Sequence, residues 1–475
     1  MTIVGNAAGV TQVYQSELRG QLGAMQAANL RDGAPDWARR LDRLERIGAM
    51  VRENQAAVIA AIDSDFGGRA REETMLGEIF TTLLAVRHAK SRLAKWMRPR
   101  RRAIGLAFWP ARARLLPQPL GVVGIISPWN YPLFLALSPL VGAVAAGNRA
   151  LLKPSELTPR TAALMGEVVA QYFAVDEIAV VQGGRAVAAA FSELPFDHLL
   201  YTGSASVGRK VMAAAAENLT PVTLELGGKS PAIIGPAAAL DAAVESIIRG
   251  KLFNAGQTCV APDYVLVPKD QVGFFVAKAL AVAGKFYPIL ADNPDYSAIL
   301  NQAQFDRLQA MLAEAAAQGA RVVVAGAGSG RKLPLTMLLE TKASMTVRRE
   351  EIFGPLLPII PYDDLSAAIA HVNGGDRPLA LYVYDRNRNN VERVLRETIS
   401  GGAVVNDCLL HAGAENLPFG GVGASGMGQY HGSDGFETFS KLKPVVYQSR
   451  LNAMWLLHPP YGRRAKCLIK FLLKR

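Results

Sequence analysis

Apolar residues recur along the first hundred positions at the spacing of amphipathic helices. Between Leu41 and Ile62 they fall three and four positions apart, which predicts a helix, and a further helix is predicted from Glu73 to Trp96. The intervening DSDFGG, residues 63–68, is typical of a break between helices. Residues 99–119 contain four prolines, which indicates an extended excursion rather than another helix.

From residue 122 onward, short apolar runs alternate with helical patterns. Strands are predicted at residues 122–126, 150–152, 178–181, 199–201 and 222–226, and helices at 133–146, 161–173 and 207–216. Thr158 and Pro159 are predicted to cap the second of these helices. Strands that alternate with helices at this spacing predict a doubly wound parallel sheet of the Rossmann type.

A second α/β pattern follows Gly227. Its predicted strands are residues 232–234, 264–267, 321–324, 357–360, 380–384 and 403–406. The chain is therefore predicted to be an α/β protein with two such units, and 475 residues suit two large domains or three smaller ones.

The charge excess narrows the classes of partner. The net charge is +12, and much of it lies in residues 95–114 and 463–475. The first patch reads as a proline-interrupted β-ribbon without a nucleic-acid recognition element, so no nucleic acid is expected to bind. The second is basic and amphipathic, so it could rest weakly on an anionic membrane surface. The plainer alternative is a last helix packed on the protein or on a partner subunit.

Cysteine usage points to a reducing compartment. The three cysteines, Cys259, Cys408 and Cys467, are too few and too scattered for a disulfide framework. The N-terminus shows no signal-peptide pattern, and no apolar run approaches the ~20 residues of a membrane-spanning helix. We therefore expect a cytoplasmic protein, and since no Cys/His group has ligand spacing, we expect no metal.

One cysteine stands in an unusual setting. Cys259 lies in FNAGQTCVAPD, after four small or polar residues, whereas structural cysteines usually sit among aliphatic side chains. A loop of this kind leaves a thiol open to approach. Cys408, after a strand, and Cys467, in the tail, are interpreted as cysteines without a chemical role.

Two polar residues next to predicted strands could assist such a thiol. Glu225 lies inside an otherwise apolar strand, where burial should raise its pKa and make it a usable general base. The alternative is a buried Glu paired with Lys or Arg. Asn130 follows the strand at 122–126, where its amide could stabilise an oxyanion; alone, it would also fit an ordinary turn.

Two further loops suit a nucleotide, although each would also fit a plain surface turn. Lys153 ends a strand and is followed by Pro, Ser and Glu156, which suits a ribose or phosphate contact. The turn from Gly203 to Gly208 joins a strand to a helix, whose first N–H groups favour a phosphate. Its glycines do not match GxGxxG.

Together these motifs carry a resemblance that extends from about residue 30 to residue 445. The chain resembles the aldehyde dehydrogenase superfamily in its class 3 branch, and most closely the bacterial coniferyl aldehyde dehydrogenases. The motifs are WNYP (129–132), LKPSE (152–156), TGSASVG (202–208), LELGGKSP (224–231), GQTCVAPD (256–263), EEIFGP (350–355) and LPFGGVGASGMG (417–428).

The resemblance implies a role for each matching residue. Cys259 would be the nucleophile, Glu225 the base that activates the deacylating water, and Asn130 an oxyanion donor beside the Cys259 amide. The residues expected to bind NAD, with NADP possible, are Lys153, Glu156, Gly203, Ser204, Val207, Gly208, Leu226, Gly227, Glu351 and Phe353.

The resemblance also implies an organisation. Residues 1–98 and 120–223 would bind NAD(P), 224–430 would form the catalytic domain, 99–119 and 431–450 an oligomerisation element, and 451–475 the basic tail. Relatives of this class imply a homodimer.

Three functions remain open at this point. The first is oxidation of aromatic aldehydes such as coniferaldehyde, and the second is the same chemistry on long-chain aliphatic aldehydes. The third is a non-catalytic dinucleotide-binding relative, which the retained Cys259, Glu225 and Asn130 argue against. Tyr131, Thr258 and residues 408–411 are expected to line the substrate pocket, with His411 and His431 near its mouth or near the glycine-rich C-terminal segment.

Overall fold

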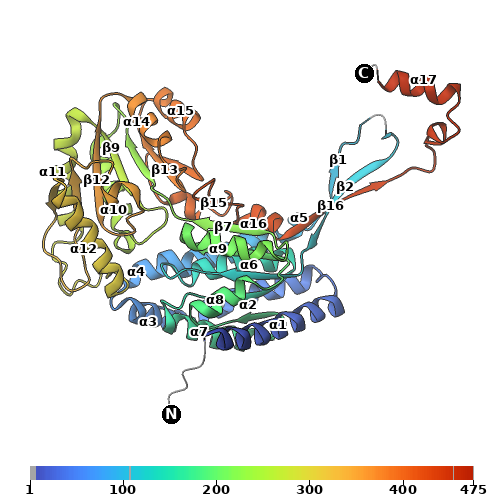
Figure 1. Cartoon of the computed structure of the whole chain (residues 1–475), viewed down its shortest axis with the longest axis horizontal. Helices are drawn as coiled ribbons and strands as arrows, with labels where there is room; N and C mark the ends of the chain where they lie inside the picture. Colours follow the sequence, from blue (N-terminus) through green and yellow to red (C-terminus); the bar gives the residue numbers. More distant parts are fainter. Residues whose placement is uncertain (1–6, 106–107, 453, 474–475) are drawn as a thin grey trace, which may run out of the picture.

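The computed structural model describes residues 7–105, 108–452 and 454–473 (Figure 1). Residues 1–6 of the predicted NAD(P)-binding domain, 106–107 of the predicted excursion, and 453 and 474–475 of the predicted tail lie outside the described residues.

The first sheet has six strands in the order β15-β7-β6-β3-β4-β5. Its parallel strands are β3 (Val122–Ile126), β4 (Arg149–Lys153), β5 (Ile178–Val180), β6 (His198–Gly203) and β7 (Val222–Leu226), and the short β15 (Gly426–Met427) pairs antiparallel with β7. The chain returns from its far end to complete this sheet.

Helices cover both faces of this sheet, which explains why its strands are apolar throughout. On β3, Val123 and Ile125 pack with α2 (Trp37–Glu53), α5 (Thr81–Trp96), α6 (Phe134–Ala146) and α7 (Pro159–Tyr172). Val122 and Ile126 pack on the other face with α1 (Ala7–Asp32), α8 (Arg185–Ser192) and α9 (Ala205–Ala216). The predicted doubly wound sheet is confirmed.

The second sheet has seven strands in the order β10-β11-β12-β9-β8-β13-β14. They are β8 (Pro231–Ile234), β9 (Tyr264–Pro268), β10 (Arg321–Val324), β11 (Thr336–Leu339), β12 (Leu356–Tyr362), β13 (Ala380–Tyr384) and β14 (Gly402–Val405). One face packs against α10 (Leu240–Leu252), α11 (Val272–Phe286) and α12 (Gln302–Ala317), and the other against α14 (Leu365–Asn373) and α15 (Arg388–Glu397). This unit is the second α/β domain that the sequence predicts.

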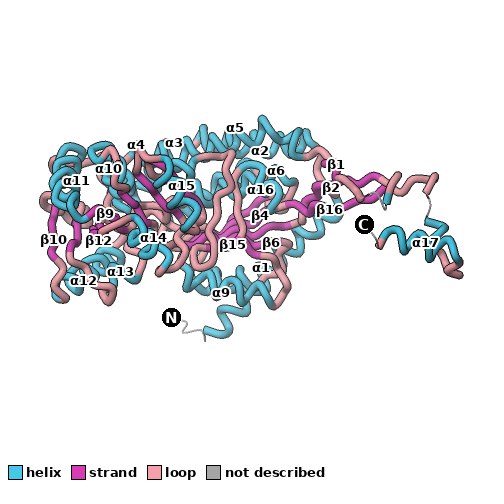
Figure 2. Tube along the Cα trace, turned by 90° about the horizontal axis from the view of Figure 1, so that it is seen from above, coloured by secondary structure: helices cyan, strands magenta, loops and turns pink. Residues whose placement is uncertain are grey.

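A three-stranded ribbon extends from this body (Figures 1 and 2). It contains β1 (Arg100–Arg102), β2 (Arg112–Pro119) and β16 (Ser440–Tyr447), all antiparallel, and it confirms the predicted extended excursion. Before it, α16 (Gly432–Thr438) packs on α5 and α6; after it come η6 (Met454–Leu457) and α17 (Arg463–Leu472). Figure 1 shows α17 beyond the ribbon, away from both large sheets. Within the described residues, the tail helix thus does not pack on either large sheet of its own chain.

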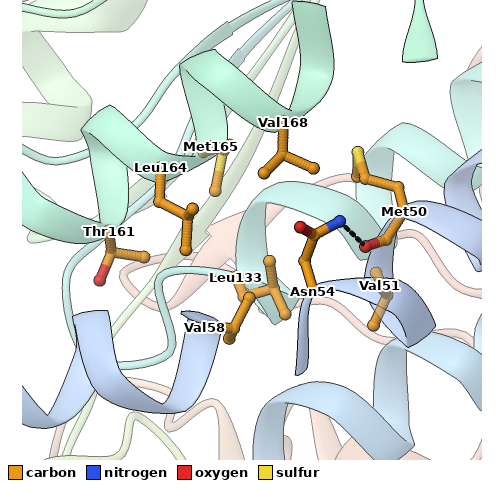
Figure 3. A pocket seen from close by; sticks show the side chains of 9 residues that line it. All are labelled: Met50, Val51, Asn54, Val58, Leu133, Thr161, Leu164, Met165 and Val168. Atoms are coloured by element: carbon orange, nitrogen blue, oxygen red, sulfur yellow. Dashed lines mark hydrogen bonds between the residues drawn. The ribbon is translucent and has the colours of Figure 1, made fainter. Parts of the chain in front are cut away.

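The helix predicted from Leu41 to Ile62 is wrong as a single element. It is two helices, α2 and α3 (Gln55–Phe66), which part at Asn54. The Asn54 amide donates to the carbonyl oxygen of Met50 at 2.9 Å, and side-chain bonds of this kind compete with the helix backbone. Figure 3 shows this bond beside a small apolar cavity between α2, α3 and α7.

Thr158 is the N-cap residue of α7 as predicted, but its side chain makes no capping bond. Asp65, at the end of α3, caps α7 instead: its carboxylate accepts from the backbone N–H of Arg160 at 3.0 Å and of Thr161 at 2.8 Å. Pro159 does occupy the first turn.

The segment from Glu73 to Trp96 is helical as predicted, but it changes type along its length. It comprises α4 (Arg71–Thr74), a π-helical turn η1 (Met75–Phe80) and α5. The π-helical turn lies beside the candidate site, a place where such turns are frequent.

Candidate active site

The loop that carries Cys259 is held in an uncommon backbone conformation. After α10 the chain enters η3 (Phe253–Gly256), in which Asn254, Ala255 and Gly256 have φ of 52°, 50° and 77°. Consecutive left-handed residues are costly and persist only where the surroundings hold them. A Cβ on Gly256 would collide with the Gly354 carbonyl oxygen, so this position requires glycine.

Gln257 fixes the loop from inside. Its amide nitrogen donates to the carbonyl oxygens of Asn254 at 3.1 Å and Ala298 at 3.0 Å, and its oxygen accepts from the N–H of Leu300 at 2.9 Å. The polar residues before Cys259 therefore anchor the backbone, as the small-residue loop suggested.

Cys259 lies in the wall of a cavity of about 400 Å³. The lining is mostly apolar and aromatic and includes Leu76, Gly77, Phe80, Thr81, Tyr131, Phe134, Leu135, Phe253, Thr258, Val260, Leu409, Leu410, Ala412, Gly413, Phe419 and Tyr430. Of the predicted lining, Tyr131, Thr258, Leu409 and Leu410 are confirmed, whereas Cys408 and His411 are buried and lie outside it.

Flat rings shape this cavity next to the sulfur. Tyr131 and Phe253 stack with centroids 6.4 Å apart and planes 13° apart. The Tyr131 hydroxyl and Thr258 Oγ1 are hydrogen-bonded at 2.8 Å, so each satisfies the other. The cavity is thus suited to an apolar, planar ligand.

Glu225 points from β7 into the interior with no compensating charge. Neither carboxylate oxygen has a hydrogen-bond partner within the described residues, and the side chain is buried. The alternative of a buried Glu paired with Lys or Arg is therefore excluded for the described chain. Burial raises the pKa of Glu225 well above its usual value, as the sequence predicted.

The Cys259 thiol lies under the influence of burial and of two carboxylates. Burial, together with the carboxylates of Glu351 and Glu225, raises the pKa of Cys259 to about 12. The backbone N–H groups of Cys259 and Val260 act on the sulfur in the opposite sense. In the chain without ligands, Cys259 is therefore a protonated thiol, and a positive charge close by would favour its reactive thiolate.

Asn130 follows β3 and is almost fully buried. Its backbone oxygen accepts from Arg69 Nη1 at 3.0 Å and Asn254 Nδ2 at 3.2 Å. Its own side-chain amide has no partner in the part of the chain that is described. The backbone is held while the amide stays available, which an oxyanion donor requires.

The second group of predicted residues lies along the edge of the first sheet. Lys153, at the end of β4, is buried, and burial lowers the pKa of its ammonium group. Its Nζ donates a hydrogen bond to the Pro154 carbonyl oxygen at 2.8 Å. The Glu156 carboxylate lies 4.0 Å from the exposed Arg185 guanidinium. Only one of the three Lys153 donors is used, so the ammonium can bind a further oxygen.

The turn between β6 and α9 supplies a helix N-terminus at the same edge. Ser204 is the N-cap, and its hydroxyl accepts from the N–H of Val207 at 3.4 Å. A Cβ on Gly208 would lie 2.7 Å from Leu226, and one on Gly203 would collide with the Tyr201 hydroxyl. Glycine at both positions lets this turn pack closely on Tyr201 and Leu226.

Glu351 and Phe353 complete this side. Gly227 lies so close to the Glu351 carboxylate that a Cβ would overlap it. Burial raises the pKa of Glu351 to about 8. Phe353 has φ of 52° and meets Trp129 edge-on, with centroids 5.3 Å apart.

Sequence reasoning missed the residues that support these positions. Lys229 binds the Asp263 carboxylate and donates to the oxygens of Val347 and Glu350, both at 2.9 Å, which holds the loop carrying Glu351. Arg69 and Asn254 hold the Asn130 carbonyl in a similar way, and Glu73 holds the backbone of Asn254. A lysine inside LELGGKSP and an asparagine just before the Cys259 loop were visible signals, whereas Arg69 gave none.

Within the described residues, no three His, Cys, Asp or Glu side chains form a group that could hold a metal ion. Across the same residues, no helix combines the length and the apolar character needed to cross a bilayer.

Comparisons with known proteins agree over nearly the whole chain. The aldehyde dehydrogenase family model matches residues 8–445, and the chain belongs to this family. It is therefore an oxidoreductase that acts on aldehydes with a nicotinamide dinucleotide.

Particular relatives refine this. A probable coniferyl aldehyde dehydrogenase of Pseudomonas aeruginosa is 51% identical over 97% of each chain, and the coniferyl aldehyde dehydrogenase of a Pseudomonas species is 47% identical, also over 97% of each. Aldehyde dehydrogenase family 3 member A2 of Mus musculus is 40% identical over 91% of this chain and 90% of its own.

The fold agrees as well. The substrate-bound AldH of Staphylococcus aureus superposes with a TM-score of 0.91 at 36% identity, covering 95% of this chain and 99% of that one. The expectation of the aldehyde dehydrogenase fold and class 3 resemblance is confirmed.

Proposed function

We propose that the chain oxidises aromatic aldehydes, coniferaldehyde among them, to carboxylic acids through a thioester on Cys259. The observation that carries this proposal is Cys259 in the wall of a cavity lined by stacked rings, with unpaired Glu225 acting on the thiol and buried Asn130 in the loop after β3. The Pseudomonas relatives named for coniferyl aldehyde support the substrate class.

The first half of the reaction uses Cys259 and Asn130. The thiolate attacks the aldehyde carbon, and the new oxyanion takes hydrogen bonds from the Asn130 amide and the Cys259 N–H. The oxidised nicotinamide, when bound, supplies the hydride acceptor. Loss of hydride from the tetrahedral carbon leaves an acyl thioester on Cys259.

The second half uses Glu225. Its carboxylate, once ionised, takes a proton from water, and the resulting hydroxide attacks the thioester carbon. The carbon–sulfur bond breaks, the acid leaves, and Cys259 returns as a thiolate. A carboxylate with a raised pKa suits this role because it is basic enough near neutral pH to accept the proton.

The residues on the second side fit a nicotinamide dinucleotide. Lys153 and Glu156 would meet the adenosine ribose, the Ser204 to Gly208 turn and Leu226 would lie against the diphosphate region, and Gly227, Glu351 and Phe353 would hold the nicotinamide end. The unused Lys153 donors and the capped N-terminus of α9 support this.

We propose NAD as the preferred form. The negative charge of Glu156 would repel a 2′-phosphate, although Arg185 at 4.0 Å partly offsets it. An Escherichia coli relative of known structure, 28% identical, is NADP-dependent, so NADP is an alternative.

The alternative substrate is a long-chain aliphatic aldehyde. It is supported by the exposed apolar side chains of Leu76, Phe80 and Leu410 at the cavity lining, which could follow a chain outward. The test compares NADH formation with coniferaldehyde and with decanal by kcat/KM. A higher value for coniferaldehyde is expected, and a higher value for decanal would overturn the aromatic assignment.

We also propose the predicted domain division and a homodimer formed through residues 99–119 and 431–450. The exposed Trp109, Val446 and Tyr447 on the ribbon support an interface there. Light scattering should give about twice the 50.9 kDa chain mass, and a monomer would contradict it.

The cysteines that are described are all free, which supports a cytoplasmic location. A weak membrane contact of 451–475 remains part of the proposal, supported by the basic, amphipathic α17.

A further inference from the structure

We propose that Arg69, Glu73 and Asn254 form a brace that positions Asn130 against Cys259, with Arg69 as its central positioning residue. None of the three need touch the substrate. The inference rests on the proposed role of Asn130 as oxyanion donor.

Two donors from distant parts of the chain converge on one carbonyl. Arg69 Nη1 and Asn254 Nδ2 donate to the Asn130 oxygen at 3.0 Å and 3.2 Å. Asn254 Nδ2 also donates to the Gln257 oxygen at 3.1 Å, two residues before Cys259. One amide group therefore ties the backbone of the oxyanion donor to the backbone of the nucleophile loop.

Glu73 closes the arrangement. Its Oε1 accepts from the backbone N–H of Asn254 at 3.0 Å, and its Oε2 accepts from the Ser297 hydroxyl and lies 4.0 Å from Arg69 Nε. Arg69, Asn130, Asn254 and Glu73 thus form a closed circuit of contacts. Such a circuit can hold the left-handed Asn254 in place.

Burial removes the Arg69 side chain from water. Its side chain is fully buried between the rings of Phe66 and Tyr131, 4.8 Å and 5.0 Å from their centroids. Its Nε and Nη2 have no hydrogen-bond partner among the described residues. A buried cation with two unpaired nitrogens is a poor source of stability, so a role in holding Asn130 and Tyr131 accounts for it better.

The consequence for rate follows from geometry. Asn130 donates to the oxyanion through its side chain, whose starting point is set by the peptide that Arg69 and Asn254 hold. A donor must lie within hydrogen-bond distance of the position that the oxyanion will occupy, and misplacement by about 1 Å can cost on the order of 100-fold in rate. Loss of one of the two hydrogen bonds that hold the Asn130 carbonyl should therefore lower the rate by less than about 100-fold.

The test uses Arg69→Lys and Asn254→Gly in the full chain. Lysine keeps the charge facing Glu73 but lacks the guanidinium fork, and glycine tolerates the left-handed backbone while removing the amide. The matched control is Arg71→Lys, because Arg71 is exposed and pairs with Glu72. The measurements are the burst rate of NADH per alkylatable thiol, KM, NAD binding and the unfolding temperature.

We expect each brace variant to lower the burst rate per thiol about 10-fold, with KM and NAD binding within about 3-fold of the unchanged protein. The control should keep its rate. A burst rate within about 2-fold in both variants, or a loss that only follows the unfolded fraction, would overturn the inference. Asn130→Ala separates the two proposals: if it too keeps its rate, the proposed role of Asn130 fails; if it alone loses rate, only the brace fails.

Discussion

The two sides of Cys259 present different chemistry to their ligands. The aldehyde side is a cavity of aromatic and aliphatic side chains, in which the Tyr131 hydroxyl already bonds to Thr258. The proposed cofactor side offers Lys153, Glu156, Glu351 and the N-terminus of α9. One side can select by shape and the other by charge.

This difference predicts how sharply each side should discriminate. A purely apolar pocket gains only about 1–3 kcal/mol from an extra or missing methylene, so substrate preference should be broad and easily shifted. Cys259, which lines the aldehyde cavity, and the buried Glu225 are proposed to carry the chemistry for both ligands, so changes there should stop the reaction. The predictions below run from that shared centre outward.

Cys259→Ala should have the largest effect. Without the sulfur no covalent intermediate can form, so NADH formation should fall by about 10⁴-fold or more. NAD binding, measured by fluorescence titration, should remain, because the proposed contacts lie on other residues. Cys408→Ala is the control and should stay active, and turnover by the Cys259 variant would remove this residue from the mechanism.

Glu225→Gln should separate the two halves of the reaction. The amide keeps the shape of the carboxyl but cannot accept a proton, so steady-state turnover should fall by roughly 10²- to 10⁴-fold. A rapid first turnover, seen as a pre-steady-state burst of NADH, should persist because thioester formation precedes the deacylation step. An unchanged steady rate would show that another group activates the water.

The proposed catalytic residues could be singled out from the sequence because each is unusual within its own short segment. Glu225 is a charge in an apolar strand, Cys259 a thiol in a small-residue loop, and Asn130 an amide at a strand end. Their surroundings in the structure match these local signals: Glu225 is buried without a partner, and Cys259 opens into a cavity.

Arg69 was not predictable for the opposite reason. In the sequence it follows two glycines like an ordinary surface residue, and its burial arises from Asn130, 61 residues away, and from Phe66 and Tyr131 around it. The brace exists only once α3, β3 and the Cys259 loop have come together.

The fold shows the same division between local and distant information. Buried strands such as β3, β7 and β13 were located to the residue, because each is a short, mostly apolar run bounded by turn or helix signals. The missed β16 mixes Lys and Pro444 with Val, and it is a strand because its partner β2 pairs with it along eight positions. The missed β15 has two residues and owes its place to β7.

Phe80→Ala tests whether the aldehyde side selects by shape. Phe80 lies in the π-helical turn, lines the cavity and is 53% exposed. Removal of the ring should lower kcat/KM for coniferaldehyde about 10-fold and that for decanal less, because a flexible chain can repack. Phe274→Ala, at 48% exposure on α11, is the matched control. Equal losses for both aldehydes would argue against selection by ring shape.

Glu156→Gln tests whether the cofactor side selects by charge, and its effect should be the smallest. A 2′-phosphate carries close to two negative charges, so removal of the carboxylate should lower the KM for NADP by about 3- to 10-fold and leave that for NAD nearly unchanged. The effect is limited because Glu156 is partly exposed and Arg185 already lies beside it. Glu167→Gln, an exposed change on α7, should alter neither value. If Glu156→Gln weakens NAD as much as it helps NADP, the carboxylate binds the ribose hydroxyls more than it repels phosphate, and the two sides of Cys259 would both select by direct contact.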